Sequence, residues 1–324
     1  MTSHPLLRVR DLAVEFHTAE GTVRAVKGVD FTVERGRTLG IVGESGSGKS
    51  VTSLAVMGLH RGATVTGSAR LDGTELIGTP DERLRTLRGR RMAMVFQDAL
   101  TALHPYFTVG DQIAEGIRAH FPVTRSEARD RALRLVEEVG IADAGARLDA
   151  YPHQLSGGMR QRVMIAIALA AEPEILVADE PTTALDVTVQ AQILEVLDRL
   201  RASRGMAVLL ITHDLGIVAG RADRVAVMYA GQIVEEASTA SLFANPSHPY
   251  TQGLFASVPR ITGPVGRLTP IGGSVPPPTA WPSGCRFRPR CPKAFDKSEL
   301  EPPLLPVGPG HRMRCWLAEP DRPA

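Results

Sequence analysis

The chain has 324 residues and a formal net charge of +2, with 43% hydrophobic and 22% charged residues. This composition is typical of a globular protein that is long enough for one large domain with an appendage, or for two domains. The near-neutral charge gives no bulk electrostatic attraction to nucleic acid. The longest apolar run, residues 163–171, is far shorter than the about 18 residues that a membrane span requires. Charges at Arg8, Arg10 and Asp11 interrupt any secretory signal, so we expect a cytoplasmic chain, or one held at a membrane by its partners.

Residues 6–42 contain short alternating apolar stretches, which predict β-strands. Their connections, with turns at Glu20-Gly21 and Arg35-Gly36, are too short for crossover helices, so we expect antiparallel pairing. The predicted strands are residues 7–9, 12–16, 23–26 and 29–33, followed by strands within residues 64–77 and 92–97.

A glycine-rich stretch at residues 43–50 fits the phosphate-loop pattern G-x-x-x-x-G-K-[ST] at every fixed position. It lies between a predicted buried strand, residues 38–42, and a predicted helix, residues 51–59, which is the context that the motif requires. The loop amides and the helix N-terminus would bind phosphate, Lys49 would reach the β- and γ-phosphates, and Ser50 would ligate Mg²⁺. A glycine-rich turn without a ligand is the alternative, but it does not account for the lysine, the hydroxyl and the flanking elements together. The residues predicted to bind the nucleotide are Gly43, Glu44, Ser45, Gly46, Ser47, Gly48, Lys49 and Ser50.

Apolar residues recur at helical spacing between Val109 and Gly140, with charges on the other faces, and predict a helical insert over about residues 99–160. Strands and helices alternate after this insert, which favours a parallel sheet covered on both faces. The predicted elements are a strand at 173–178, a helix at 187–204, a strand at 207–211, and a hairpin of 224–228 with 232–235.

Two further motifs carry chemistry. Asp179 and Glu180 end a predicted strand, where one carboxylate can hold Mg²⁺ and the next can polarise a water for attack on a γ-phosphate. Acids at strand ends are often merely solvated, so this assignment depends on the phosphate loop upstream. Ser156-Gly157-Gly158 precedes an apolar helix and offers a second anion site, although the same residues cap many ordinary helices.

The order and spacing of these motifs resemble the ATP-binding-cassette (ABC) ATPases over residues 6–236. The resemblance implies an α/β fold, with a P-loop NTPase core, an antiparallel β subdomain and an α-helical subdomain. It also implies that two such domains pair head to tail and enclose two ATP molecules, so that a partner completes each site. The resemblance rests on the phosphate loop, Gln97, Leu155-Ser156-Gly157-Gly158, Asp179-Glu180, Ala184-Leu185-Asp186 and His213.

The resemblance implies a role for each matching residue. Phe16 would stack on adenine, although it could equally be a core residue. Glu180 would act as general base, with Lys49, Gln97 and His213 as the other catalytic residues. Met159 stands where glutamine is commonest in the family, but Ser156 and backbone amides make the main contacts there. Mg²⁺ would be held by Ser50, Gln97 and Asp179. The ATP of the other subunit would contact the signature residues Ser156, Gly157 and Gly158, and Asp186 would lie between the subunits.

The composition changes after Pro259, because 15 of the 24 prolines lie in residues 259–324. This predicts a separate, irregular region without long helices or central strands, with residues 260–280 as a linker. Residues 242–254 and 284–295 resemble the segments that follow the cassette in ATPases of oligopeptide and dipeptide importers. We therefore expect an ABC nucleotide-binding domain at 6–258 and a peptide-importer-type C-terminal region at 259–324.

This resemblance implies a subunit that hydrolyses ATP to drive import of di- or oligopeptides, bound peripherally to the cytoplasmic face of the cell membrane. The implied partners are a second ABC ATPase in a heterodimer, two transmembrane permease subunits and an extracytoplasmic solute-binding protein, with no nucleic acid. Nickel importers share most of these features, so an importer of nickel or another small solute is an alternative. A soluble ABC ATPase not involved in transport is disfavoured by the single cassette and the cysteine-containing tail. A cassette that only binds ATP is disfavoured because Glu180 and His213 are both present.

The three cysteines, Cys285, Cys291 and Cys315, all lie in the tail. In many relatives the tail has four cysteines that bind an iron–sulfur cluster, but Ser298 stands at the fourth position here. Three interpretations remain open: a cluster with another ligand on its fourth iron, three thiols without metal, or zinc with His311 or another ligand. Nearby arginines would favour thiolates, or form a basic face; they are Arg286, Arg288, Arg290, Arg312 and Arg314.

Overall fold

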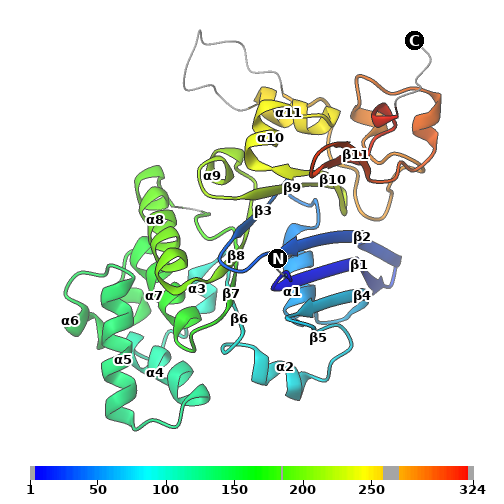
Figure 1. Ribbon diagram of the computed structural model, residues 1–324. Helices are drawn as coiled ribbons and strands as arrows, with labels where there is room; N and C mark the ends of the chain where they lie inside the picture. Colours follow the sequence, from blue (N-terminus) through cyan, green and yellow to red (C-terminus); the bar gives the residue numbers. More distant parts are fainter. Residues whose placement is uncertain (1–3, 184, 258–269, 320–324) are drawn as a thin grey trace. The chain divides into compact units, whose positions relative to one another are not determined.

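The computed structural model describes residues 4–183, 185–257 and 270–319, and the chain divides into two compact units (Figure 1). We call the first the loop unit; it comprises residues 7–32, 38–78 and those from 212 onward. The second, which we call the helical unit, comprises residues 33–37 and 79–211 together with the residues before Leu7. Within the described ranges no helix is both long and apolar enough to cross a membrane.

The loop unit contains an antiparallel sheet of β1 (Leu7–Thr18), β2 (Gly21–Val33), β4 (Ala63–Leu71) and β5 (Thr74–Glu75), in the order β2-β1-β4-β5. β1 pairs antiparallel with β4, a pairing that was not predicted, and the four short strands predicted before residue 34 are two long ones. β1 stays continuous because a β-bulge absorbs Asp11, which has a φ of 46°. A Cβ at Gly67 would lie 2.3 Å from the carbonyl oxygen of Asp11, so only glycine fits opposite the bulge.

Strands of a second sheet in the loop unit include part of the C-terminal region, in the order β11-β12-β10-β9-β3. β3 pairs in parallel with β9, β9 forms the predicted hairpin with β10, and β12 pairs antiparallel with both β10 and β11. The prediction of a tail without central strands is wrong here, because β12 lies between β10 and β11. β12 contains no proline, and Pro306 lies in β11, which has a neighbour on one side only among the described strands. The bounds are β3 Thr38–Val42, β9 Arg224–Tyr229, β10 Gln232–Ser238, β11 Leu305–Gly308 and β12 His311–Met313.

Short helices complete the loop unit. α1 begins at Lys49, two residues earlier than predicted, because Gly48 at its N-cap takes a φ of 100° that glycine tolerates. Every helix described beyond residue 270 is a 3₁₀ turn of at most four residues, and part of the predicted linker lies outside the described residues. The helices are α1 Lys49–Val56, α9 Leu215–Ala219, α10 Thr239–Ala244 and α11 Pro249–Ser257, with 3₁₀ turns η2 Arg288–Arg290, η3 Asp296–Glu299 and η4 Trp316–Ala318.

The helical unit contains the predicted parallel strands β6 (Met92–Val95), β7 (Ile175–Asp179) and β8 (Ala207–Thr212), with β7 between the other two. Every residue of β7 and β8 is buried, as their continuous apolar runs predicted. α8 (Val187–Arg204) has the predicted bounds, because Asp186 caps its start and Gly205 ends it at a φ of 61°. α2 (Asp81–Leu87) was not predicted.

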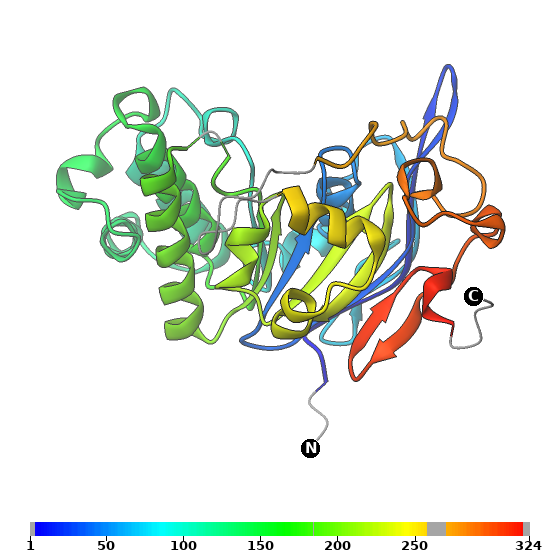
Figure 2. The ribbon, with the colours of Figure 1, turned by 90° about the horizontal axis from the view of Figure 1, so that it is seen from above.

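The remaining helices lie in one cluster of the helical unit, in which α4, α5 and α7 pack side by side (Figures 1 and 2). A capping box begins α5: the Thr124 hydroxyl accepts the Glu127 N–H at 3.2 Å, and the Glu127 carboxylate accepts the Thr124 N–H at 2.8 Å. The bounds are α3 Ala99–Ala102, α4 Val109–His120, α5 Arg125–Glu138, α6 Ala144–Leu148, η1 Pro152–Gln154 and α7 Gly157–Leu169.

Candidate nucleotide-binding site

The phosphate-loop residues lie between β3 and α1, in the strand–loop–helix arrangement that the motif requires. Gly46 and Gly48 have φ angles of 77° and 100°. A Cβ at Gly43 would lie 2.1 Å from the Met228 carbonyl oxygen, and one at Gly48 would lie 2.9 Å from that of Ala25. Backbone conformation and close neighbours therefore both require glycine in this loop.

Two polar groups of the loop unit are buried within the loop. The Lys49 side chain is 4% exposed, and its Nζ donates to the carbonyl oxygens of Gly43 at 2.8 Å and Glu44 at 3.1 Å. Ser47 Oγ is also buried and has no hydrogen-bond partner among the described residues. A phosphate oxygen would accept hydrogen bonds from both the hydroxyl and the ammonium, so these residues fit a phosphate ligand. Ser50 follows Lys49 in the first turn of α1.

Phe16 and His213 are the other predicted site residues of the loop unit. Phe16 is only half-buried near the end of β1, so it is not a core residue. His213 is exposed directly after β8. The turn around His213 is fixed, because the Asp214 N–H donates to Thr212 Oγ1 at 3.0 Å and the Asp214 carboxylate accepts the Gly216 N–H at 2.7 Å.

The helical unit brings Gln97 and Glu180 together at the end of its sheet. Asp179 is the last residue of β7, and Glu180 follows at a φ of 45°. The Glu180 carboxylate accepts hydrogen bonds from Gln97 Nε2 at 3.2 Å and Thr183 Oγ1 at 3.0 Å. The Glu180 N–H donates to the Ile211 carbonyl at 2.9 Å. The sequence interpretation missed Thr183, although a hydroxyl three residues after an acid is a recognisable turn pattern.

The signature residues begin α7, and Ser156 is its N-cap, accepting the Met159 N–H at 3.3 Å. Only the backbone of Met159 takes part in this cap, so its departure from glutamine does not disturb it. A Cβ at Gly158 would lie 2.5 Å from Val189 Cγ1, in the first turn of α8. Asp186 caps α8 by accepting the Val189 N–H at 2.9 Å, so the signature and the Asp186 loop lie side by side.

The three tail thiols line a cavity of about 10 Å³, which has room for one water at most. Ser298 Oγ accepts the Phe295 N–H at 3.1 Å, and none of the cysteines forms a disulfide. Burial raises the pKa of both Cys285 and Cys291, so the expectation that nearby arginines favour thiolates is wrong for these two. The described residues contain no group of three His, Cys, Asp or Glu side chains arranged to hold a metal ion. This donor set does not fit an iron–sulfur cluster or zinc.

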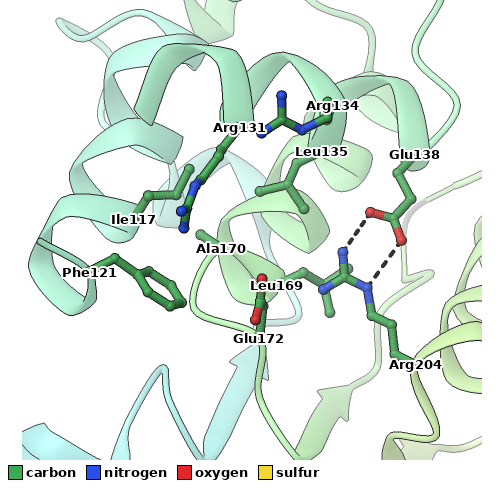
Figure 3. Close-up of a pocket in the computed structure, with 10 residues that line it drawn as sticks. All are labelled: Ile117, Phe121, Arg131, Arg134, Leu135, Glu138, Leu169, Ala170, Glu172 and Arg204. Atoms are coloured by element: carbon green, nitrogen blue, oxygen red, sulfur yellow. Dashed lines mark hydrogen bonds and ion pairs between the residues drawn. The ribbon is translucent and has the colours of Figure 1, made fainter. Parts of the chain in front are cut away.

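The helical unit also has a cavity of about 580 Å³ that shares no residue with the predicted site (Figure 3). Arg204 and Glu138 form an ion pair at 2.6 Å on one side of it, and Phe121 lies on the other with Arg131 above its ring at 5.1 Å. Arg204 is thus paired and Arg131 stacked, and the cavity shares no lining residue with the predicted nucleotide site.

A glycine loop between strand and helix, a buried lysine, an acidic strand end and a glycine-containing helix start capped by Ser156 define a P-loop nucleotide-binding protein. The model of the ABC transporter family matches residues 26–183, and that of the oligopeptide/dipeptide transporter C-terminal region matches residues 234–297. The chain is 49% identical over 318 residues to the oligopeptide transport ATP-binding protein AppD of Bacillus subtilis, covering 97% of each chain. It is 52% identical to OppD of Mycobacterium tuberculosis over 319 residues, which cover 97% of this chain and 52% of that protein. The chain therefore belongs to the ABC transporter family, in the group that carries the oligopeptide/dipeptide transporter C-terminal region.

Solved structures agree with this assignment. The dimeric structure of a bacterial ABC transporter cassette matches with a TM-score of 0.66 and 28% identity, covering 72% of this chain and 98% of that one. The cassette cbiO1 of Clostridium perfringens, part of the ABC transporter complex cbiONQ, matches with a TM-score of 0.64 over 75% of this chain and 92% of that one. The predicted P-loop NTPase fold is confirmed, and the chain is an ABC-type ATPase.

Proposed function

We propose that this chain is the ATP-hydrolysing subunit of an ABC importer of di- or oligopeptides. The observation that carries the proposal is the 49% identity with AppD. The matched region covers 97% of both chains and includes the C-terminal region as well as the cassette. A cassette match alone would support ATP-driven transport without a substrate class.

In this proposal Lys49 and the loop amides bind the β- and γ-phosphates of ATP, and the unsatisfied Ser47 hydroxyl supports that assignment. Glu180 aligns the attacking water, and its hydrogen bonds to Gln97 and Thr183 support a fixed carboxylate. Ser50, Gln97 and Asp179 would hold Mg²⁺, which neutralises charge on the β- and γ-phosphates when bound. His213 would stabilise charge on the γ-phosphate, and Phe16 would stack on adenine.

The signature would serve the ATP of a second cassette. Ser156, Gly157 and Gly158 present amides at the start of α7, beside Asp186 at the start of α8. Two separate anion sites in one chain suit a head-to-tail pair, in which each ATP lies between a loop and the partner's signature. A related cassette is described as dimeric, which supports the pairing, and we propose a different ABC ATPase as the partner.

An apolar hollow next to Gln97 supports the proposal of permease partners. It has a volume of about 360 Å³, and the exposed Phe96 directly precedes Gln97. A short apolar helix of a transmembrane subunit would fit this hollow and sense the Gln97 segment, and it would hold the chain at the cytoplasmic face of the cell membrane. A solute-binding protein outside the cell would then deliver the peptide. The hollow is lined by Met94, Phe96, Thr101, Ala102, Leu103, Met164, Ile167 and Ala168.

We propose that the tail keeps its fold without an iron–sulfur cluster, because Ser298 and the protonated thiols are poor iron ligands. Iron and sulfide analysis of anaerobically purified protein tests this. We expect less than about a tenth of a cluster per chain, and a stoichiometric cluster would contradict the proposal.

Purification from detergent-solubilised membranes tests the transport function. We expect the tagged chain to copurify with two permease subunits and a second ABC ATPase, and the complex in vesicles to take up peptide at the expense of ATP. Uptake of nickel without peptide would contradict the substrate class. A chain found only in the soluble fraction, without membrane partners, would contradict the transport function itself.

A further inference from the structure

The phosphate loop of this chain is contacted by residues far beyond the cassette core, through Glu44. The Glu44 N–H donates to Tyr250 Oη in α11 at 3.0 Å. The Glu44 carboxylate accepts two parallel hydrogen bonds from Arg290 in η2, Nη1 to Oε1 at 3.0 Å and Nη2 to Oε2 at 3.2 Å. Arg290 and Glu44 are 246 residues apart in the sequence, yet they form a bidentate pair.

Arg290 is itself held in place, so it can fix what it binds. Its side chain is 5% exposed, its Nε donates to the Gly272 carbonyl at 2.8 Å, and its Nη1 lies 3.5 Å from Tyr229 Oη. Burial alone would lower the pKa of Arg290, but the hydrogen bonds to Glu44 and Tyr229 raise it above the ordinary value. A buried, charged and fully bonded guanidinium is a rigid support.

A second contact reaches the loop from the same tail segment. Arg286 stacks on the Trp281 ring, 3.5 Å from its centroid, and donates to the Ala230 carbonyl in the turn between β9 and β10. Gly231, the next residue of that turn, donates its N–H to the Ser47 carbonyl at 2.8 Å. A Cβ at Gly231 would lie 2.5 Å from Trp281 Cη2, so the indole packs directly against the backbone of this turn.

We propose that Arg290 and Tyr250 are positioning residues of the phosphate loop, through which the C-terminal region sets the affinity of this ATPase for nucleotide. The loop binds phosphate through amides whose directions depend on the backbone between Gly43 and Gly48. A loop held at Glu44 and Ser47 before the nucleotide arrives loses less conformational freedom on binding. The inference rests on the proposed function of residues 43–50 as the nucleotide-binding loop.

Binding of mant-ADP with Mg²⁺ to the purified full-length chain tests this inference, because ADP binding needs neither hydrolysis nor a partner signature. We expect Arg290→Met to raise the Kd roughly tenfold, the size of a lost charge-assisted hydrogen-bonded pair, and Arg290→Lys to restore part of the affinity. Arg288→Met is the matched control. Arg288 lies in the same 3₁₀ turn but pairs with Glu299 at 2.9 Å, so we expect an unchanged Kd.

A double-mutant cycle separates positioning from a general loss of structure. If Arg290 acts through the Glu44 carboxylate, then Glu44→Ala, which removes both acceptors, raises the Kd, and Arg290→Met adds nothing in the Glu44→Ala background. An equal loss in both backgrounds overturns the inference. A Glu44→Ala variant that binds as the wild type does overturns it even if Arg290→Met does not fold. Lys49→Ala distinguishes a failure of the positioning role from a failure of the proposed nucleotide site. If Lys49→Ala binds mant-ADP as the wild type does, residues 43–50 are not the nucleotide-binding loop. If Lys49→Ala loses mant-ADP binding but Arg290→Met does not, only the positioning role is refuted.

Discussion

Glu180 combines an unusual backbone with a fixed side chain. A non-glycine residue at a φ of 45° is strained by about 1 kcal/mol or more, and such strain persists only where neighbours hold it. Here the hydrogen bond to the Ile211 carbonyl holds the backbone, while Gln97 and Thr183 hold the carboxylate. Two groups thus direct the carboxylate and a third holds the backbone, as a residue that must align a water requires.

His248 predicts a pH dependence of stability. It is fully buried, its Nδ1 accepts the Tyr250 N–H at 3.0 Å, and burial lowers its pKa to about 3. The folded protein therefore keeps the imidazole neutral, whereas the unfolded chain binds a proton below pH about 6.5. Stability is lost as the pH falls through the window between these values.

Replacing His248 by Asn keeps an acceptor for the Tyr250 N–H but removes the titration. Between pH 7 and 5.5 we expect the wild type to lose about 1 kcal/mol more unfolding free energy than His248→Asn, as measured by urea denaturation. Equal losses in the two proteins would show that His248 does not stay neutral in the fold.

At the scale of elements, local signals were predictable and distant pairings were not. α8 was predicted with its observed bounds because its apolar period and both caps lie in its own sequence. β1 was predicted in two fragments, because the charged residues at its bulge, Arg10 and Asp11, interrupt the apolar pattern. β12 was missed because its pairing partner is about 76 residues earlier, at Glu236 opposite Arg312.

The residues of the candidate site also divide into those that the sequence could predict and those that it could not. The loop, the strand-end acids and the signature could be found because their chemistry depends on short fixed spacings. Arg290 could not be assigned to Glu44, since no spacing rule connects residues 246 positions apart. The metal site was suggested only by resemblance to relatives with four tail cysteines, and the raised pKa values of Cys285 and Cys291 and the bonded Ser298 hydroxyl do not fit such a site.

The capping box of α5 predicts a measurable contribution to stability. Thr124→Ala removes the acceptor of the Glu127 N–H, and we expect a loss of about 1 kcal/mol in urea unfolding. Thr86→Ala is the control, because Thr86 lies inside α2, is exposed and caps no helix. If both substitutions change stability equally, the cap does not stabilise α5.

At the scale of the whole molecule, the signature is proposed to act on the nucleotide of another chain. Gly157→Asp tests this, because it places a negative charge at the signature without disturbing the fold. A Cβ at Gly157 meets only Leu185 Cδ2 at an ordinary 3.5 Å, and an acid in the first turn of α7 stabilises the helix. We expect an unchanged or higher melting temperature and normal mant-ADP binding, but at least tenfold slower ATP turnover by the assembled transporter, roughly the effect of losing charge stabilisation.

Gly145→Asp in α6 is the matched control, since a Cβ there meets nothing within 4 Å. It should leave turnover unchanged. Normal turnover in Gly157→Asp would mean that the signature does not meet a phosphate.

The central claim is that Glu180 aligns the water for ATP hydrolysis in a peptide importer, and Glu180→Gln tests it most directly. The substitution keeps the size of the side chain and its acceptor for Gln97 and Thr183, but removes the negative charge. In the assembled transporter in vesicles, we expect ATP turnover and peptide uptake to fall by about a hundredfold or more while nucleotide binding stays at the wild-type level. Turnover at the wild-type rate in Glu180→Gln would contradict the account.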